Sequence, residues 1–285
     1  MTMLRINLLG EPRISASDDS AIRLPTKKAQ ALLIYLASPP GVARARDQLA
    51  GLLWSRNPDA QARTNLRQNL ARLRKSLGDA KGVITADAHR IALTADLAET
   101  DIVEFERLLS RGDVASLETA TELLRGEFAA GLHINEPPFE DWIANERRRV
   151  SELAIAALGR LLTHYEDRND PDKTAFLAAK LLAIDPLQER VHQSFMRARA
   201  DQDRFESALQ QYTICRDLLR KELAIEPSEA MRALQAEIVR RREAVRHAPT
   251  APAVETVGYC AFLATSHLVS WRWQPTCHRS CKAST

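Results

Sequence analysis

One stretch of the sequence, ARTNLRQNLARLRKSLG at residues 62–78, combines side chains that could bind a polyanion. It contains five basic residues and no acidic one. Its leucines at 66, 70, 73 and 77 recur at the spacing of one face of an α-helix and predict a core-facing stripe. The other faces would present amide, hydroxyl and cationic groups, which read base edges and hold phosphates in a DNA major groove. The alternative is a helix whose charged face is only solvated.

The helical wheel divides these polar residues between two expected roles. Because Gln can be bidentate to adenine and Arg to guanine, base contacts are expected from Thr64, Gln68 and Arg72. Other cations on this helix and before it are expected to hold phosphates: Arg63, Arg67, Arg74, Lys75, Lys27, Lys28, Arg44 and Arg46. The last four are equally open to the alternative of ordinary surface cations.

The elements before and after the basic helix predict how it is positioned. A small antiparallel sheet is expected from short extended runs at residues 3–9, 11–15 and 21–24. Three helices are expected: one that begins after Pro25-Thr26, one over residues 46–54 and one over residues 59–77. The third follows a turn whose Asp59 could cap it. A β-hairpin is expected over residues 83–94. This order is a helix-turn-helix followed by a wing, in which the later helix lies in the major groove.

The tip of the predicted hairpin carries two residues suited to nucleic acid. His89 and Arg90 could contact the phosphate backbone or the minor groove, or form a plain solvated turn. Trp54 and Trp142 could stack on bases, but their positions favour packing in the core.

Residues 101–243 predict successive amphipathic helices throughout. Turn signals separate them, including Asp185-Pro186 and Glu226-Pro227-Ser228. Ala208 with Tyr212 four residues later fits the small-and-large packing of tetratricopeptide repeats. The two prolines are 41 residues apart rather than 34, so the repeats are expected to be imperfect. The predicted fold class is mainly α: a winged helix-turn-helix with a small β-sheet, followed by an all-α, tetratricopeptide-like domain.

The charge of the chain is distributed unevenly along its 285 residues. Residues 1–98 carry 15 Lys and Arg against 8 Asp and Glu, and residues 99–245 carry 21 against 28. This asymmetry predicts a DNA-binding domain over residues 1–98 and a helical domain over 99–245 that does not meet the polyanion. Residues 246–285 are expected to be a linker and a disordered tail.

Several absences are expected from the sequence. It has no 18-residue apolar run and no signal peptide, so no membrane contact is expected. Cys215 is the only cysteine before residue 260, which fits a reducing compartment. A cytoplasmic, nucleoid-associated protein is therefore expected. No nucleophile motif, phosphate loop or metal-ligand spacing is found before the tail, so we expect neither an enzyme nor a cofactor. His133, His164 and His192 share no spacing and predict no metal site.

The tail beyond residue 256 changes character, and two interpretations of it stay open. One is a metal-binding knuckle built from Cys260, His267, Cys277, His278 and Cys281, although their spacing fits no standard zinc pattern. The preferred interpretation is a non-native end, produced by a frameshift or a truncation that removed a further domain.

The quoted residues also resemble those of a known family. LLGEPRI, LPTKKAQALLIYLA, RDQLAGLLW, the basic helix and VITADAHRIAL resemble an OmpR-like winged helix. LLRGEFAAGLHINEPPFEDWIANERRRV, LLAIDPLQERVH and the ALQQY…LAIEPS stretch resemble the bacterial transcriptional activator domain. Over residues 3 to about 243 the chain is similar to SARP-type regulators, which implies an activator that binds direct repeats near promoters and recruits RNA polymerase. Unlike many larger relatives, the chain has no G-x-x-x-x-G-K-[ST] motif.

Taken together, the residues predict a sequence-specific DNA-binding regulator, and the resemblance implies that it is a transcriptional activator. Its helix 59–77 is expected to read promoter DNA, and its helical domain to contact RNA polymerase or a second protomer. The alternative is a tetratricopeptide-like adaptor without specific DNA binding. An adaptor has no need of an acid-free basic helix beside a wing.

Overall fold

The computed structural model describes residues 3–247, which begin with a three-stranded sheet. Its strands, in the order β2-β1-β6, are β1 (Leu4–Asn7), β2 (Arg13–Ala16) and β6 (Ala98–Thr100). β1 pairs antiparallel with β2, as the sequence predicts, and parallel with β6, which the sequence does not reveal. The predicted extended run at 21–24 contributes only a single bridge, between Ala21 and Ser15.

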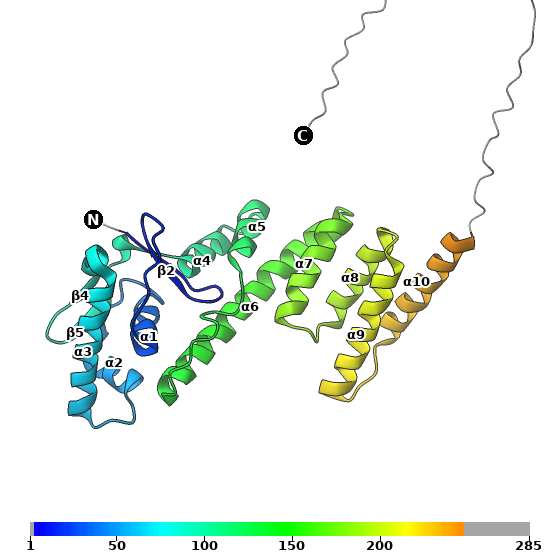
Figure 1. Ribbon diagram of the computed structural model, residues 1–285. Helices are drawn as coiled ribbons and strands as arrows, with labels where there is room; N and C mark the ends of the chain where they lie inside the picture. The colour runs from blue at the N-terminus through cyan, green and yellow to red at the C-terminus, as the bar shows by residue number, and fades with distance from the viewer. Residues whose placement is uncertain (1–2, 248–285) are drawn as a thin grey trace, which may run out of the picture. The chain divides into compact units, whose positions relative to one another are not determined.

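Three helices and a second small sheet form the predicted winged helix-turn-helix. The helices are α1 (Lys27–Leu36), α2 (Arg46–Leu53) and α3 (Asp59–Leu77). The hairpin of β4 (Ile84–Ala86) and β5 (Arg90–Leu93) is joined by the two-residue β3 (Arg44–Ala45). Two 3₁₀ helices, η1 (Gly78–Val83) and η2 (Ala95–Leu97), connect these elements. In Figure 1 α3 lies at the outer edge of this part of the molecule.

The start of α3 corrects one expectation. The capping position is Pro58, which makes no side-chain capping bond, and Asp59 is the first helical residue. Asp59 still favours the helix start because its carboxylate lies in the first turn, where the helix dipole attracts negative charge. The predicted stop at Gly78 is confirmed, with φ of 54° in the left-handed region that favours glycine.

Seven helices follow the winged helix within the described residues. They are α4 (Asp101–Arg111), α5 (Val114–Leu123), α6 (Pro137–Asp167), α7 (Pro171–Ile184), α8 (Glu189–Asp201), α9 (Phe205–Leu223) and α10 (Glu229–His247). From α6 onward neighbouring helices pack side by side in Figure 1, as in helical-repeat proteins. Ala208 is fully buried in the core formed by α8, α9 and α10. Tyr212 is partly buried and packs against that core. The mainly helical fold class is therefore confirmed.

The hydrophobic core of the winged helix continues into the helical part. One cluster of buried side chains extends from Leu4 in β1 to Ala154 in α6 and includes Phe105 and Phe139. β6 lies across the boundary predicted between residues 98 and 99. The first half of α6 thus completes the core of the winged helix, while its second half packs against α7.

One expectation is about membrane spans and another is about the tail. Within residues 3–247, no helix combines the length and apolarity that a membrane span requires. The expectations for the tail, including the cysteines and histidines from Cys260 to Cys281, lie outside the described residues. α10 itself extends to His247, two residues into the predicted linker.

Candidate nucleic-acid interface

The inner face of α3 holds the helix against the core. Leu66, Leu70, Leu73 and Leu77 are all at most 4% exposed, which confirms the predicted stripe. Asn69 is also buried, and its side-chain amide donates to the hydroxyl of Thr26, the residue that caps α1. These contacts fix which side of α3 faces outward.

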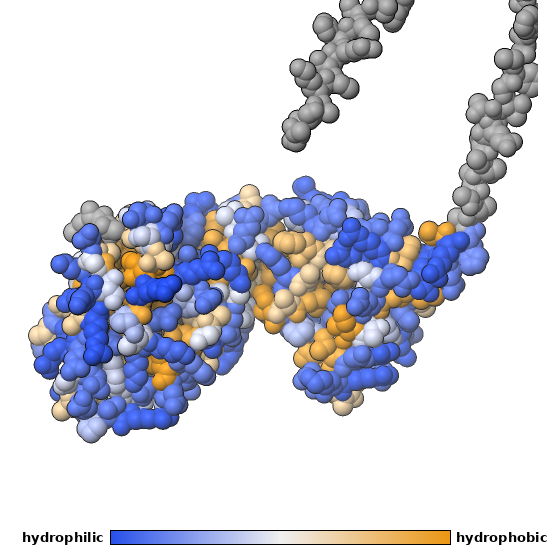
Figure 2. Space-filling view, in the orientation of Figure 1, coloured by the Kyte–Doolittle hydropathy of each residue, from blue (hydrophilic) through white to orange (hydrophobic). Residues whose placement is uncertain are grey.

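The outer face of α3 presents polar groups to solvent. Arg67, Gln68, Arg72 and Lys75 are exposed, and their side chains have no partner within residues 3–247. Thr64 is half-buried, and its hydroxyl donates to Ala60 O at 3.0 Å while remaining able to accept. Hydrophilic side chains predominate over this edge in Figure 2. The structure thus groups the residues predicted to contact base edges on one solvent-facing surface.

A hollow beside the first half of α3 gathers arginines from α2 and α3 together with the wing-tip histidine. It is lined by Arg46 at the start of α2, by Arg63 and Arg67 on α3, and by His89 at the wing tip. Asp47 also lines it and forms an exposed ion pair with Arg63, at 2.7 Å between Arg63 Nε and the carboxylate. Residues far apart in the sequence therefore form one largely cationic surface.

The wing tip is fixed in place by hydrogen bonds. Asp87 accepts from the backbone N–H groups of His89 and Arg90, each at 2.7 Å, and these bonds lower the pKa of its carboxyl group. The guanidinium of Arg46 donates to Asp87 O, and the Arg46 backbone N–H donates to His89 O. The wing is thereby positioned relative to α2, and the His89 and Arg90 side chains stay exposed.

Besides Arg46 and Arg63, two more of the predicted phosphate-binding arginines are engaged within the fold. Arg74 donates to Ile84 O at 3.0 Å and ties the second half of α3 to β4. The guanidinium of Arg44 lies 5.1 Å from the ring centroid of Tyr35, and its Nε is buried without a hydrogen-bond partner in the described structure. Both side chains are half-buried, so each has a positioning role that the sequence does not reveal.

Lys28 is engaged more strongly within the fold. Its ammonium forms a 2.7 Å ion pair with Glu136, whose side chain is only 6% exposed, and lies 5.1 Å from the ring of Trp54. Its charge is therefore neutralised inside the protein, and a phosphate contact would leave a buried carboxylate without its cation. Lys27, one residue earlier, is exposed and has no side-chain partner within residues 3–247.

Glu136 is a buried acid that sequence reasoning missed. Burial raises the pKa of its carboxyl group, but hydrogen bonds from Lys28 and then from the Ser55 hydroxyl outweigh that effect and leave the pKa lowered. Glu136 also precedes α6 as its capping residue. The available signal was an acid directly before Pro-Pro at a helix start.

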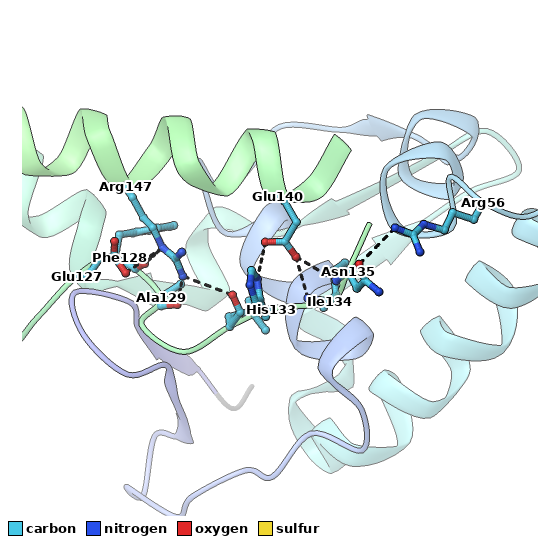
Figure 3. A network of polar contacts seen from close by, with 10 residues as sticks. Arg56, Glu127, Phe128, Ala129, His133, Ile134, Asn135, Glu140 and Arg147 are labelled. Atoms are coloured by element: carbon cyan, nitrogen blue, oxygen red, sulfur yellow. Dashed lines mark hydrogen bonds and ion pairs between the residues drawn. The ribbon is translucent and has the colours of Figure 1, made fainter. Parts of the chain in front are cut away.

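The segment between α5 and α6, residues 124–136, contacts both the winged helix and α6; we call it the connecting segment. Arg147 on α6 donates to the backbone oxygens of Phe128 and Ala129, and Glu140 accepts from the backbone N–H groups of Ile134 and Asn135 (Figure 3). Each of these α6 side chains satisfies several backbone groups. The connecting segment therefore has a defined path along α6.

Asp101, at the start of α4, is a second buried acid that the sequence does not single out. Its two oxygens accept from the backbone N–H groups of Leu8 and Leu9 at 2.6 and 3.0 Å, and from Arg125 at 2.7 Å. The connecting segment also pairs directly with the chain just after β1, through an isolated bridge between Leu9 and Phe128. Together these contacts join β1, α4 and the connecting segment.

The two tryptophans pack as the sequence predicts. Trp54 is 7% exposed, and Trp142 contacts the rings of Tyr35, Phe128 and Phe139 at centroid distances of 4.8, 6.5 and 5.3 Å.

Among residues 3–247, no group of three or more His, Cys, Asp or Glu side chains is arranged to hold a metal ion. His133 instead contacts Glu140, and His192 contacts Gln211 and Pro186 O.

The fold joins a winged helix to a helical-repeat array through one shared core. The bacterial transcriptional activator domain family matches residues 100–239 of this chain. The chain is therefore similar to regulators of the SARP type, as its residues predict.

Curated relatives agree with this assignment. The chain is 27% identical over 270 residues to the regulatory protein DnrI of Streptomyces peucetius, covering 89% of this chain and 99% of DnrI. It is 28% identical over 257 residues to the regulatory protein AfsR of Streptomyces griseus, covering 88% of this chain and 26% of AfsR. It is also 28% identical to the transcriptional regulator RedD of Streptomyces coelicolor, over 83% of this chain and 70% of RedD. These relatives are named as regulators rather than as enzymes, and the chain is a transcription regulator.

A solved structure shows the same fold. Mycobacterium tuberculosis EmbR, in complex with a low affinity phosphopeptide, superposes with a TM-score of 0.60 at 21% identity. The match covers 85% of this chain and 66% of EmbR.

Proposed function

We propose that this regulator activates transcription by binding promoter DNA sequence-specifically through the outer face of α3. The observation that supports this most is the contrast on α3 itself. Its leucines are buried, whereas Arg67, Gln68, Arg72 and Lys75 lack side-chain partners within residues 3–247. Cations left in solvent on a helix of this position are available to a polyanion.

The roles within the interface follow from where each side chain lies. Thr64, Gln68 and Arg72 contact base edges in the major groove. Phosphates are held by the cations that stay accessible on α3 and beside it: Arg63, Arg67, Lys75, Lys27 and Arg46. The wing residues His89 and Arg90 contact the neighbouring backbone or minor groove. Arg74 and Arg44 position α3 and β3, and Lys28 is not part of the DNA-contacting set.

The test is fluorescence anisotropy of the chain on duplexes selected from a random pool, across a salt series. Gln68→Ala should relax the selected consensus at one position and cost about 1–3 kcal/mol there. Lys75→Ala should weaken binding to all sequences alike and lower the salt slope by about one unit. Binding without any sequence preference would contradict the proposal and favour the tetratricopeptide-like adaptor.

We propose further that the helical part supplies protein contacts at the promoter. It would contact either RNA polymerase or a second protomer on an adjacent repeat, at the nucleoid. Its acidic balance over residues 99–245 makes it unsuited to lie on DNA itself. The test is site-directed photocrosslinking from α7, α8 and α9 on promoter DNA, with polymerase present or absent. Absence of any crosslink to polymerase or to a second copy would rule out this part of the proposal.

A further inference from the structure

A hollow of about 410 Å³ lies where the connecting segment meets α6 and α7. Its floor is the apolar side of α6, formed by Val150, Ala154 and Leu158. One wall comes from α7, with Ile184 and Lys180. The other wall is the start of the connecting segment, residues 124–128. The volume is within the range of small-molecule sites, roughly 300–1,000 Å³, and the lining is mostly hydrocarbon, as in such sites.

The charged groups of this hollow are not equally engaged. Arg125 is paired with Asp101 at 2.7 Å, and Glu127 with Arg147 at 3.3 Å. Lys180 forms no ion pair with a carboxylate within residues 3–247, and its ammonium donates only to Thr121 O, at 2.9 Å.

The environment of the Lys180 ammonium leaves room for one more acceptor. The group has three N–H donors, of which one meets Thr121 O, and it lies 5.0 Å from the centroid of the Phe176 ring. Burial lowers the pKa of Lys180, and the charge of Glu122 offsets this only in part, as expected for a partly desolvated cation without a contacting counter-ion. A ligand anion would supply that counter-ion.

We propose that this hollow is a binding site for a small amphipathic carboxylic acid, with its hydrocarbon part on α6 and its carboxylate on Lys180. Neither part of the site serves the proposed DNA interface, so the inference is independent of it. A carboxylate on a partly buried ammonium forms a charge-assisted hydrogen bond, which is stronger than one between neutral groups. A hydrocarbon chain in the hollow gains mainly because its own apolar surface is removed from water, since the α6 floor residues are already at most 3% exposed.

The position of the site gives it a consequence for the whole fold. Residues 124–128 line the hollow, and one of them, Phe128, also pairs with Leu9 in the chain just after β1. Arg125 in the same wall holds Asp101. A bound acid therefore stabilises the contact between the winged helix and the helical part, and it should raise the midpoint of thermal unfolding of the full chain.

The experiment is isothermal titration calorimetry of the full chain with three eight-carbon probes: octanoate, 1-octanol and octylammonium. We expect saturable binding of octanoate at one site, weaker binding of octanol and weaker still of octylammonium. Lys180→Met, which keeps the hydrocarbon stem, should weaken octanoate about tenfold or more and leave octanol within about twofold. Ala183→Phe, at an exposed position in the wall, should weaken octanoate and octanol together.

Lys221→Met is the matched control, because Lys221 is an exposed lysine that does not line the hollow. It should leave all three titrations unchanged. Three results would overturn the proposal: no saturable binding of octanoate by the folded wild-type chain up to about 1 mM, octylammonium binding as tightly as octanoate, or Lys221→Met weakening octanoate as much as Lys180→Met does.

Discussion

The outer face of α3 and the junction around the connecting segment use the same kinds of charged residue in opposite ways. At the junction, Asp101, Glu136 and Arg147 each make several hydrogen bonds to backbone or side-chain partners. On α3, Arg67 and Lys75 have no side-chain partner within residues 3–247. At the junction the charged groups are hydrogen-bonded within the protein, whereas those on the outer face of α3 remain available to a ligand.

This difference separates stability from binding. A buried charge that loses its partners costs several kcal/mol, whereas an exposed unpaired lysine contributes little to folding. Substitutions at the junction should therefore destabilise the protein and leave intact the groups that we propose contact DNA. Substitutions on the outer face of α3 should change DNA binding and leave stability unchanged.

The largest expected effect comes from cutting the chain at the boundary that charge and pattern suggest. A fragment of residues 1–98 lacks Phe105, Phe139 and the α6 residues that complete its core. It also leaves the backbone N–H groups of Leu8 and Leu9 without Asp101. We expect this fragment to give no cooperative unfolding transition by circular dichroism in urea, whereas residues 1–247 should give one. A fully stable, cooperatively folded 1–98 fragment would show that the winged helix does not need the helical part.

Asp101→Ala should destabilise the protein more than any single substitution on the outer face of α3. It leaves two buried backbone N–H groups without acceptors and Arg125 without its partner, for a loss of about 3 kcal/mol in the free energy of unfolding. Urea denaturation measures this loss. Asp96→Ala, at an exposed position, is the control and should change stability by less than about 0.5 kcal/mol. An equal effect of both substitutions would mean that the Asp101 bonds are energetically unimportant.

A pair of lysine substitutions compares the two regions directly. Lys28→Met removes the cation from Glu136 and should cost about 2 kcal/mol of stability while leaving the salt dependence of DNA binding unchanged. Lys75→Met should do the reverse, with unchanged stability and a salt slope lower by about 0.9. Denaturation and anisotropy on both variants provide the test. A reduced salt slope in Lys28→Met would return Lys28 to the phosphate-contacting set.

The same comparison explains what sequence reasoning could and could not reach. The leucine spacing of α3 and the hairpin at 83–94 are local patterns, so both were predicted correctly. β6 and its parallel pairing with β1 depend on a contact between residues more than 90 positions apart. The roles of Lys28 and Glu136 depend on a pairing over 108 positions, which no local pattern encodes. The local sequence around a lysine or arginine therefore does not show whether the side chain contacts a phosphate or pairs with a buried acid.

The smallest expected effect concerns Asp47, the acid that lies among the cations of the candidate interface. Its exposed ion pair with Arg63 is worth at most about 1 kcal/mol, so it can break when a phosphate arrives. Asp47→Asn removes a negative charge from that surface and frees Arg63, and should strengthen binding to all DNA sequences by about two- to fivefold. Arg63→Ala should weaken DNA binding. Asp47→Asn should strengthen DNA binding less when it is added to Arg63→Ala than when it is made in the wild-type protein. Anisotropy at low salt measures all four proteins. If Asp47→Asn weakens binding instead, the Arg63–Asp47 pair serves to orient Arg63 toward DNA rather than to restrain it.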